Sequence, residues 1–418
     1  MLSRSTAKEL KWGPMERDVL KSRESEVHII GGGVAGLSCA LNLARVGLRV
    51  NIYERREQSA FAGMGFLMMP NGVESLQRLF GPDELKSLNA LTVSDAQVFY
   101  LDDGELKPSR KAPLLGASIK RPPLIELLKA KCLAAGVKLH HNTQLNQLEK
   151  AGTPEAPELL KLSFEVEGGP DQRESLELKA HYVIAADGAN STLRAQLAPE
   201  LQLSSPKITE FVGISRCELP SPLSAWLKDQ SEVRLHKYQN LTKRQAFGWM
   251  PLSRDEYIWY AQLLYRDSLP RVDGAERQQQ LLSFFEGWPE PVLSLIKSCA
   301  FTRTYRWDTC DLEPMRPCLV DGVLFMGDAA HASLTLSSQG VSSALEDSAQ
   351  LAQCFQELNS APRPGARAAL SPSSWRELCE RFERARTPVW ERRFHEARQL
   401  QRDFLDARPY AELPVVSP

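Results

Sequence analysis

The chain of 418 residues has no apolar run near the roughly 18 residues that a membrane-spanning helix needs. Its formal net charge is −1, so it also lacks the basic excess that marks a nucleic-acid-binding surface. We therefore expect neither a membrane span nor a nucleic-acid partner. The hydrophobic fraction of 43% and the charged fraction of 25% are those of a globular protein, and the length allows more than one domain.

Paired cysteine motifs are also missing. The eight cysteines are scattered, with no C-x-x-C spacing and no paired histidines beside them. This distribution predicts reduced thiols and no metal site. Residues 1–26 carry charges of both signs and lack the apolar core of a secretory signal. We interpret them as a peripheral extension of a cytoplasmic protein.

A strand, a turn and a helix open the part of the chain with a regular pattern. Residues 27–30 form a short apolar run that leads directly into glycines, and residues 34–46, rich in alanine and leucine, predict a helix. Residues 48–54 predict a second strand. Strand, helix and strand within about 30 residues make a βαβ unit, which indicates a parallel sheet.

Glycines occupy the turn of this unit at the spacing of a dinucleotide-binding loop. Gly31, Gly33 and Gly36 fit G-x-G-x-x-G, with Val34 and Ala35 between the last two. The first glycine permits a tight turn, the second lets the backbone approach a pyrophosphate, and the third lets helix and strand pack closely. Backbone N–H groups at the helix start then face the phosphate charge. Taken alone, the glycines fit an ordinary turn equally well.

An acid follows the glycines at the distance expected for a ribose contact. Glu54 ends the second strand, 18 residues after Gly36, and Arg55 follows it. Alone, Glu54 fits a solvated surface acid as well. Together, the glycines and Glu54 predict dinucleotide binding, but they do not distinguish FAD from NAD.

Two later segments each have a short apolar strand that ends in an acidic turn. Residues 181–186 lead into Asp187, and residues 322–326 lead into Gly327 and Asp328. The carboxylate of Asp328 can hold the sugar-alcohol chain of a flavin, and the helix predicted after it can direct its positive end at the flavin ring. Alone, either segment fits an ordinary strand–turn–helix.

In this order the three motifs resemble those of the flavin-dependent aromatic hydroxylases, the single-component FAD monooxygenases typified by p-hydroxybenzoate hydroxylase. The resemblance runs from Val27 to about Leu400. Gly63-Met-Gly65 with Pro70-Asn71 resembles the family's G-x-G…P-N loop, and Arg121-Pro-Pro-Leu124 resembles its R-x-x-L, whose arginine reaches FAD. The predicted cofactor contacts are Gly31, Gly33, Val34, Ala35, Gly36, Glu54, Arg55, Gly65, Arg121, Asp187, Gly327, Asp328, Gly340 and Val341.

The resemblance implies an oxidoreductase with tightly but non-covalently bound FAD. In that family NAD(P)H reduces the flavin, O2 adds at its C4a carbon, and the hydroperoxide gives one oxygen atom to an aromatic substrate by hydroxylation or epoxidation. Because the chain has no second G-x-G-x-x-G, NAD(P)H is expected to bind transiently. The reaction is expected to centre on the flavin, and the resemblance gives His331 a structural role.

One loop departs from the family pattern. Where the family often has proline and asparagine after the third motif, this chain has Ala332, Thr335, Ser338 and Ser342. We therefore expect a more polar and less rigid loop beside the flavin.

Residues 91–117 and 211–310 differ from the rest of the chain in their residue pattern. Polar and aromatic residues partly alternate there, as in antiparallel strands with one ligand-facing side. Later apolar residues recur at helical spacing, interrupted by Pro388, which should kink or restart the helix. The predicted fold is α/β: an N-terminal extension (1–26), a Rossmann-like FAD-binding domain (27–90, 118–210 and 311–355), an inserted antiparallel-sheet substrate domain (91–117 and 211–310) and a C-terminal helical segment (356–418).

The inserted sheet is expected to contact the substrate. Phe247 and Trp249 represent an aromatic density that suits a planar, largely apolar molecule, although strand alternation assigns about half of such residues to the core. Arg216 and His236 are candidate anchors for a polar group. Without tandem carboxylate-binding arginines, the sequence favours a larger aromatic or quinone-like product of secondary metabolism over a simple benzoate.

Other functions fit the same FAD motifs. A flavin-dependent halogenase or a geranylgeranyl-reductase-like enzyme is one alternative, but residues 247–251 match only part of the W-x-W-x-I-P motif. A non-turnover, FAD-bound sequestering protein is another, prompted by the unusual loop.

The aromatic residues of the C-terminal helix fit packing on the flavin domain better than contact with a membrane, because acids are interspersed with the bases. The sequence does not predict the oligomeric state.

Overall fold

The computed structural model describes residues 20–21, 26–57, 64–102, 105–152, 159–169, 172–218, 232–253, 255–301, 304–359 and 370–408. Gly63 and most of the predicted N-terminal extension lie outside these ranges.

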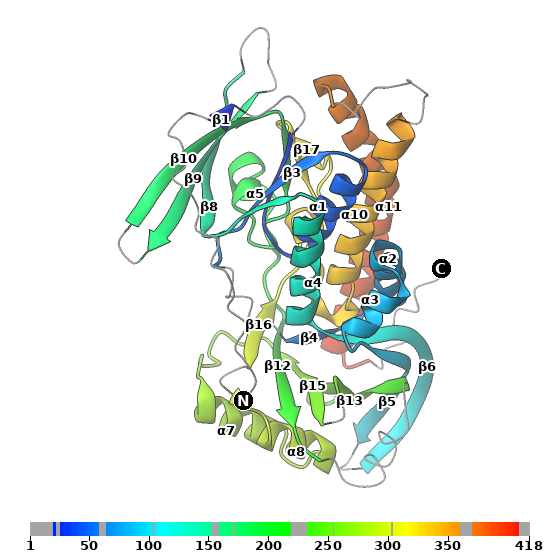
Figure 1. The fold of residues 1–418 in the computed structure, drawn as a ribbon. Helices are drawn as coiled ribbons and strands as arrows, with labels where there is room; N and C mark the ends of the chain where they lie inside the picture. Colours follow the sequence, from blue (N-terminus) through cyan, green and yellow to red (C-terminus); the bar gives the residue numbers. More distant parts are fainter. Residues whose placement is uncertain are drawn as a thin grey trace, which may run out of the picture.

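A six-stranded sheet forms the centre of the flavin-binding part (Figure 1). Its strands, in spatial order, are β17 (Leu319–Val320), β18 (Val323–Phe325), β11 (Tyr182–Ala185), β2 (Glu26–Ile30), β3 (Arg49–Tyr53) and β7 (Lys138–His140). Every neighbouring pair is parallel except β17–β18. Because β2, β11 and β18 are adjacent and parallel, the three predicted motifs meet at the carboxyl edge of one sheet, where α/β proteins bind their ligands.

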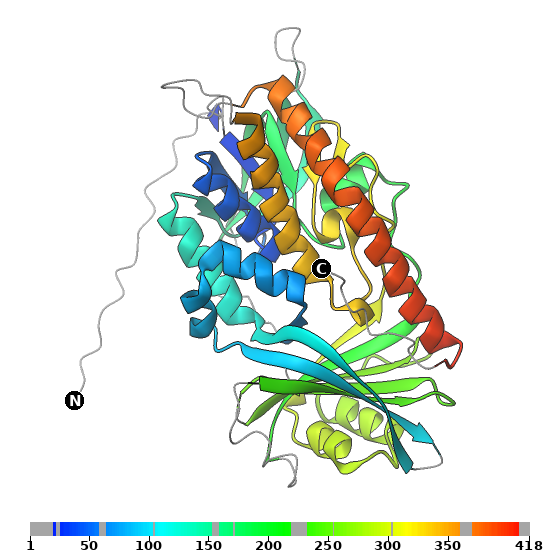
Figure 2. The same ribbon diagram turned by 90° about the vertical axis from the view of Figure 1, so that its right-hand side faces the viewer.

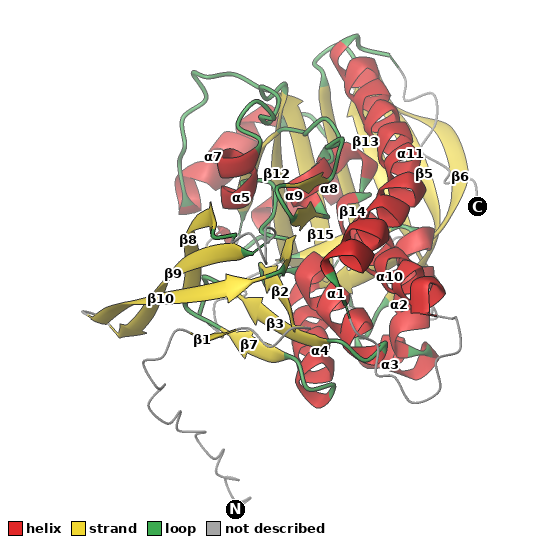
Figure 3. Cartoon of the chain, turned by 90° about the horizontal axis from the view of Figure 1, so that it is seen from above, coloured by secondary structure: helices red, strands yellow, loops and turns green. Residues whose placement is uncertain are grey.

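Helices pack on one side of this sheet and a smaller sheet lies on the other (Figures 1 and 3). α1 contacts both α4 and α10, and α10 also contacts α2 and α11 (Figure 2). The helices of this part are α1 (Val34–Arg45), α2 (Pro70–Phe80), α3 (Pro82–Ser87), α4 (Arg121–Ala134), α5 (Thr192–Leu197), α9 (Asp328–His331), α10 (Gly340–Asn359) and α11 (Pro372–Leu405).

The smaller sheet has four strands in the order β1 (Leu20–Lys21), β10 (Gln172–Ala180), β9 (Leu160–Gly169) and β8 (Thr143–Lys150). β9 and β10 pair as an antiparallel hairpin. Tyr53 of β3 stacks on Phe164 of β9, with ring centroids 4.5 Å apart, which joins the two sheets.

An eight-stranded sheet forms the second part of the molecule. Its strands, in order, are β16 (Tyr305–Thr309), β12 (Ile208–Arg216), β15 (Glu256–Leu264), β14 (Gln245–Pro251), β13 (Glu232–Asn240), β5 (Leu91–Asp102), β6 (Glu105–Lys120) and β4 (Gly65–Met68). The sheet is antiparallel as predicted, except at the parallel pair β13–β5. β4 joins it from a segment that the sequence placed in the FAD-binding domain.

The two faces of the eight-stranded sheet have different neighbours. α7 (Gly274–Phe284) and α8 (Glu290–Lys297), which the sequence did not predict, pack on the face turned away from the flavin-binding part (Figure 1). We call this the outer face. The inner face carries Val212, Leu235 and Met250, which cluster with Met64 and Met69 at the two ends of the β4 segment.

The C-terminal helix α11 packs along α10 (Figure 2). It begins with a capping box at Ser371 and continues through Pro388, so it does not restart there as the proline had suggested. Its five large aromatic residues are all buried, which agrees with packing against the rest of the protein: Trp375, Phe382, Trp390, Phe394 and Phe404. Within the described ranges, no helix has both the length and the apolar character to cross a membrane.

Candidate functional site

The three motif glycines after β2 have different roles. The fold requires two of them, and the third leaves room for a ligand. Gly31 has φ of +109°, and a Cβ on it would lie 2.3 Å from the carbonyl oxygen of Ala186. A Cβ on Gly36 would lie 1.9 Å from the carbonyl oxygen of Gly31. At Gly33, no atom of the described residues lies within 4 Å of the Cβ position. Gly33 therefore leaves open space at the start of α1, where a pyrophosphate would approach.

Glu54 lies beside this turn, as predicted. Its carboxylate accepts hydrogen bonds from the backbone N–H of Gly32 at 2.7 Å and from that of Arg56 at 2.9 Å. Glu54 is only half-buried, so it fixes the glycine loop and still borders a pocket. The pocket is lined by Ile30, Gly31, Tyr53, Glu54, Arg55, Thr143, Gln144, Leu145, Asp187, Asn190 and Thr192. The first two predicted motifs therefore share one pocket.

Asp187 follows β11 and caps α5. Its Oδ2 accepts hydrogen bonds from the backbone N–H of Thr192 at 2.8 Å and of Leu193 at 3.3 Å. Its Oδ1 is buried without a hydrogen-bond partner among the described residues. Burial raises the pKa of Asp187, against these hydrogen bonds. A buried carboxylate oxygen without a partner is costly, so Oδ1 is suited to accept a hydrogen bond from a bound ligand.

Arg194 connects the second motif to the third. The buried guanidinium donates from Nη1 to the carbonyl oxygen of Ala329 at 3.0 Å and from Nε to that of Leu201 at 3.2 Å. Ala329 is the residue after Asp328, so the turns that end β11 and β18 are held together by one side chain. The partners of Arg194 are visible only in the fold.

Gly327 and Asp328 begin α9 at the end of β18. Gly327 has φ of +57°, and a Cβ on it would lie 2.9 Å from the Cβ of Ala35, so the third motif packs on the start of α1. Asp328 Oδ1 would lie 3.6 Å from a Cβ on Gly340, at the start of α10. The Asp328 side chain keeps exposed surface, yet desolvation by the dense surroundings raises its pKa. The predicted residues Gly327, Asp328 and Gly340 therefore lie together.

Arg121 lies between the two ends of the predicted cofactor site. Desolvation and the charge of Arg56 lower its pKa. Asp328, Tyr305 and Glu54 act in the opposite direction, so the guanidinium interacts with the acids of both ends and with a tyrosine of the eight-stranded sheet. Its side chain is exposed and thus accessible to an anionic ligand.

Gly65 has a packing role in addition to any role in binding. It pairs with Lys120 at the start of β4, and a Cβ on it would lie 2.7 Å from Leu252 Cδ2. The backbone N–H of Arg121 donates to the carbonyl oxygen of Met64 at 2.8 Å, which fixes Arg121 next to this strand.

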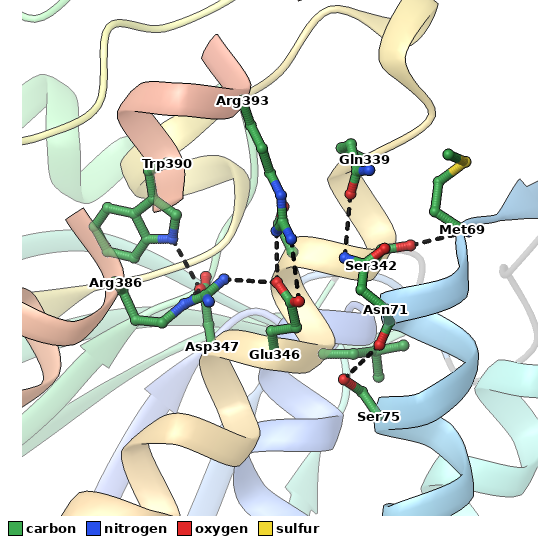
Figure 4. Close-up of polar contacts among 12 residues, drawn as sticks. Met69, Asn71, Ser75, Gln339, Ser342, Glu346, Asp347, Arg386, Trp390 and Arg393 are labelled. Carbon is green, nitrogen blue, oxygen red and sulfur yellow. Dashed lines mark hydrogen bonds and ion pairs between the residues drawn. The ribbon is translucent and has the colours of Figure 1, made fainter. Parts of the chain in front are cut away.

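The unusual loop after α9 contains a 3₁₀ turn, η2 (Thr335–Ser337), and leads into α10. The end of the loop and the first turn of α10 contact the start of α2. Ser342 Oγ accepts a hydrogen bond from the backbone N–H of Met69 at 3.2 Å, and Gln339 Oε1 accepts one from Asn71 Nδ2 at 3.2 Å (Figure 4). A Cβ on Gly72 would lie 2.4 Å from Ser342 Oγ. The loop is polar as predicted, and its serine and glutamine bind the start of α2.

A buried cluster of charged and aromatic residues supports the third motif from behind (Figure 4). Asp347 Oδ2 accepts a hydrogen bond from the Gly327 N–H at 3.1 Å and lies 2.6 Å from His331 Nε2. Its Oδ1 accepts from Arg386 Nε at 2.8 Å and from Trp390 Nε1 at 2.9 Å, both on α11. The Asp347 cluster consists of His331, Glu346, Asp347, Arg386, Trp390 and Arg393.

His331 belongs to this cluster and not to an exposed catalytic pair. Its ring is buried and stacks on Trp390, with centroids 4.3 Å apart. The structural role implied for His331 agrees with these contacts. The sequence assigned no role to Arg386 or Arg393 and expected Trp390 only to pack on the flavin domain; the only further signal was arginine and tryptophan at helical spacing on an otherwise charged helix.

The predicted substrate contacts lie on three strands of the eight-stranded sheet: β12, β13 and β14. Arg216 is exposed at the end of β12, where it pairs with Asp255 at 3.2 Å and Glu256 at 3.0 Å. Phe247 and Trp249 are buried on the outer face, in the cluster that contains residues of α7 and α8. The sequence interpretation assigned about half of such aromatic residues to the core, and these two lie there.

His236 lies on the same outer face. Its ring stacks on Trp249 at 4.3 Å, and burial lowers its pKa to about 4. An aromatic run along a strand does not indicate its own face, because alternation provides aromatic residues for both. The two helices that cover the outer face had gone unpredicted, and they decide which half is core.

The residues at the carboxyl edge of the parallel sheet fit FAD. Gly33 leaves space for a pyrophosphate, Asp187 offers an unpaired buried oxygen, and Asp328 offers an exposed carboxylate further along the same edge. Glu54 lies at the opposite end, and Arg121 lies between. The site thus has the anion-binding helix start and the carboxylates that a flavin dinucleotide requires.

Comparison with known proteins agrees with this geometry. The family model described as "FAD binding domain" matches residues 24–363. The chain is 26% identical over 337 residues to the aurachin C monooxygenase/isomerase of Stigmatella aurantiaca, covering 79% of this chain and 80% of that protein. It is 24% identical over 363 residues to the 6-hydroxynicotinate 3-monooxygenase of Bordetella bronchiseptica, covering 79% and 82%.

Solved structures show the same fold. Klebsiella pneumoniae HpxO, in complex with FAD and uric acid, superposes with a TM-score of 0.68 at 18% identity over 90% of this chain and 87% of that one. The family model covers most of the chain, and the three motifs of this chain meet at one edge of the six-stranded sheet. The protein is therefore a member of the FAD-binding-domain family of flavoprotein monooxygenases.

Proposed function

We propose that the protein is an NAD(P)H- and O2-dependent monooxygenase that hydroxylates or epoxidises an aromatic substrate between its flavin and the inner face of the eight-stranded sheet. The position of Arg121 is the observation that carries this proposal. Arg121 begins α4 directly after β6 of the eight-stranded sheet, and the charges of Asp328, Tyr305 and Glu54 act on its guanidinium. This position supports a reactive end that opens toward the inner face.

Each residue of the site has a distinct task in this function. Gly33 and the start of α1 would hold the pyrophosphate, Glu54 the adenosine ribose, and Asp328 the sugar-alcohol chain. The start of α10 at Gly340 would stabilise negative charge on the flavin ring. Bound FAD would supply the oxygen chemistry, with two electrons from NAD(P)H and one oxygen atom from O2. The second oxygen atom leaves as water.

The apolar part of the inner face would exclude water and hold the ring of the substrate. Leu235, Met250 and Ile258 are buried there beside Met64 and Met69. Such a surface favours a planar, largely apolar molecule. The two relatives named above act, by their names, on aurachin C and on 6-hydroxynicotinate, and HpxO was solved with uric acid, which supports an aromatic or heteroaromatic substrate.

The experiment combines flavin uptake with turnover. Purified protein should show a flavin spectrum, and NAD(P)H oxidation should accelerate with at least one member of a panel of phenols, quinolones and aromatic polyketides. The product should gain one oxygen atom from isotopically labelled O2. A protein that takes up no FAD would overturn the proposal, and flavin-loaded protein whose NAD(P)H oxidation never responds to an aromatic ligand would overturn the substrate class.

A further inference from the structure

The inner face carries a buried polar patch that neither the cofactor site nor the Asp347 cluster uses. Cross-strand pairing places five residues in one row, running over β13, β14, β15, β12 and β16: Lys237, Gly248, Tyr260, Val212 and Tyr305. The next row places Gln239, Gln262 and Glu210 beside the first. Lys237 and Glu210 are 3% and 6% exposed, so two charged side chains lie inside the sheet–flavin-domain boundary.

Tyr260 lies flat in this row because Gly248 has no side chain. A Cβ on Gly248 would lie 2.2 Å from Tyr260 Cζ, so the ring occupies the space above that strand. Lys237 Nζ lies 5.8 Å from the centroid of the same ring. An aromatic face at this distance stabilises an ammonium group.

Glu210 is anchored by neutral donors. Its Oε2 accepts a hydrogen bond from Gln262 Nε2 at 2.7 Å, and the Thr335 hydroxyl donates to the same carboxylate. Burial raises the pKa of Glu210, whereas these two hydrogen bonds and the charge of Lys237 favour the carboxylate form. Burial lowers the pKa of Lys237 to about 7, and the charge of Glu210 opposes this shift. The amine can thus gain or lose a proton near neutral pH.

Both sides of the patch reach the reactive end of the cofactor site. Thr335 lies in the loop between Asp328 and Gly340, and Tyr305, at the end of the row, interacts with Arg121. Lys237 is buried at one end of the row, whereas Tyr260 and Tyr305, further along it, are half-buried. Solvent therefore reaches the row from the tyrosine side.

The patch also holds acceptors that lack a donor. Gln239 and Gln262 are each 1% exposed, and the Oε1 atom of each has no hydrogen-bond partner among the described residues. Buried amide oxygens of this kind usually have a partner, so these two oxygens can accept a hydrogen bond from a ligand or an ordered water.

We propose that Lys237 is the specificity-determining residue of the site: its amine binds an acidic hydroxyl on the ring of the aromatic substrate and takes its proton. This inference rests on the proposed function. The substrate O–H bond breaks, an N–H bond forms on Nζ, and no electrons are transferred. The resulting ammonium lies beside the anionic oxygen, with Glu210 as the positioning residue and the face of Tyr260 next to it. A ring that carries an anionic oxygen is richer in electrons and accepts an electrophilic oxygen atom more readily.

The test measures binding by flavin-loaded protein in the absence of NAD(P)H. The probes are para-nitrophenol and hydroxyquinoline, each compared with its methyl ether, which cannot ionise. The colour of bound para-nitrophenol reports its ionisation directly. We expect at least one hydroxyl probe to bind about 10-fold more tightly than its ether, a difference of about 1.4 kcal/mol, and to be held ionised.

Lys237→Met should abolish this preference, whereas Lys243→Met, an exposed lysine on the same hairpin, should leave it unchanged. The proposal fails if neither hydroxyl probe is preferred, or if the preference survives in Lys237→Met. In the latter case Lys237 and Glu210 form a purely internal ion pair.

Glu210→Gln gives a second test if Lys237→Met does not fold. Loss of the neighbouring carboxylate should lower the pKa of Lys237 and reduce the ionised fraction of the bound probe; an unchanged fraction would contradict the assignment. Flavin content and NAD(P)H oxidation of the same preparation separate the two proposals. Protein without FAD refutes the proposed function, whereas flavin-loaded protein without a hydroxyl preference refutes only the role of Lys237.

Discussion

His331 Nε2 lies 2.6 Å from Asp347 Oδ2, and this contact joins the turn that carries Asp328 to the helix that begins at Gly340. The same carboxylate accepts hydrogen bonds from Arg386 and Trp390 of α11. Two flavin-facing elements and the C-terminal helix therefore depend on one buried acid.

Removal of that acid should be strongly destabilising. Asp347→Ala leaves the buried Arg386 guanidinium without its nearest counter-charge, a change that costs about 3–5 kcal/mol when one partner of a buried pair is removed. Urea unfolding and flavin content would measure it, and FAD should be released more readily. Glu74→Ala is the control, because Glu74 forms an exposed pair with Arg78 at 2.6 Å that is worth about 1 kcal/mol or less. Equal losses in the two variants would contradict this role of Asp347.

Acid should weaken the same cluster. Burial alone would raise the pKa of Asp347, but the charges of His331 and Arg386 and their hydrogen bonds bring it well below its usual range. A carboxylate with a depressed folded-state pKa contributes stability above its unfolded pKa of about 3.9, and this contribution is lost as the pH falls below that value. Asp347→Asn should flatten the acid limb of the stability–pH curve. Parallel curves for the native protein and the variant would refute this origin of acid sensitivity.

Alanine substitutions at two glycines of the first motif should have different effects. Gly31→Ala forces a Cβ against Ala186 at positive φ and should reduce the stability of the protein itself. Gly33→Ala meets no described atom, so it should fold with native stability and lose FAD affinity, because the methyl group occupies the space of the pyrophosphate. Thermal unfolding of the apoprotein and FAD titration separate the two effects. If Gly33→Ala bound FAD normally, the pyrophosphate would have to lie elsewhere.

Asp328 provides a test at the other end of the cofactor. Asp328→Ala should weaken FAD binding about 10- to 100-fold, as expected for one or two charged hydrogen bonds worth about 1.5–3 kcal/mol. Its side chain is exposed, so the apoprotein should retain its stability, unlike Asp347→Ala. Fluorescence titration with FAD measures the affinity. Retention of FAD at native strength would remove Asp328 from the site.

The parts of this site that local spacing specifies could be predicted from the sequence. Gly31, Asp187 and Asp328 each follow a short apolar strand, and parallel strands bring such turns to one edge. The partners of Asp347 on α11 could not be predicted, because Arg386 and Trp390 lie about 40 residues further along the chain and only packing brings them close.

The face of the sheet that each aromatic residue occupies could not be predicted for a related reason. Phe247 and Trp249 alternate with Gly248 and Met250 on the same strand, and the sequence pattern does not show which set faces the flavin. The register does show it: Lys237, Gly248 and Tyr260 share the inner face. A buried lysine and a glycine carry little sequence signal, so this row was overlooked.

Lys237 should leave a signature on the stability of the fold that does not depend on any ligand. Its folded-state pKa of about 7 lies below the unfolded value of about 10.4, so the unfolded chain binds more protons between these values and native stability rises with pH across that window. Lys237→Met carries no charge to bury. The variant should therefore be more stable than the native protein below about pH 7, and the gain should shrink as the pH approaches 10. Urea unfolding across this range, with Lys243→Met as the exposed control, measures the difference. A constant offset between the two curves would show that Lys237 stays protonated in the folded protein, with Glu210 as a permanent ionic partner.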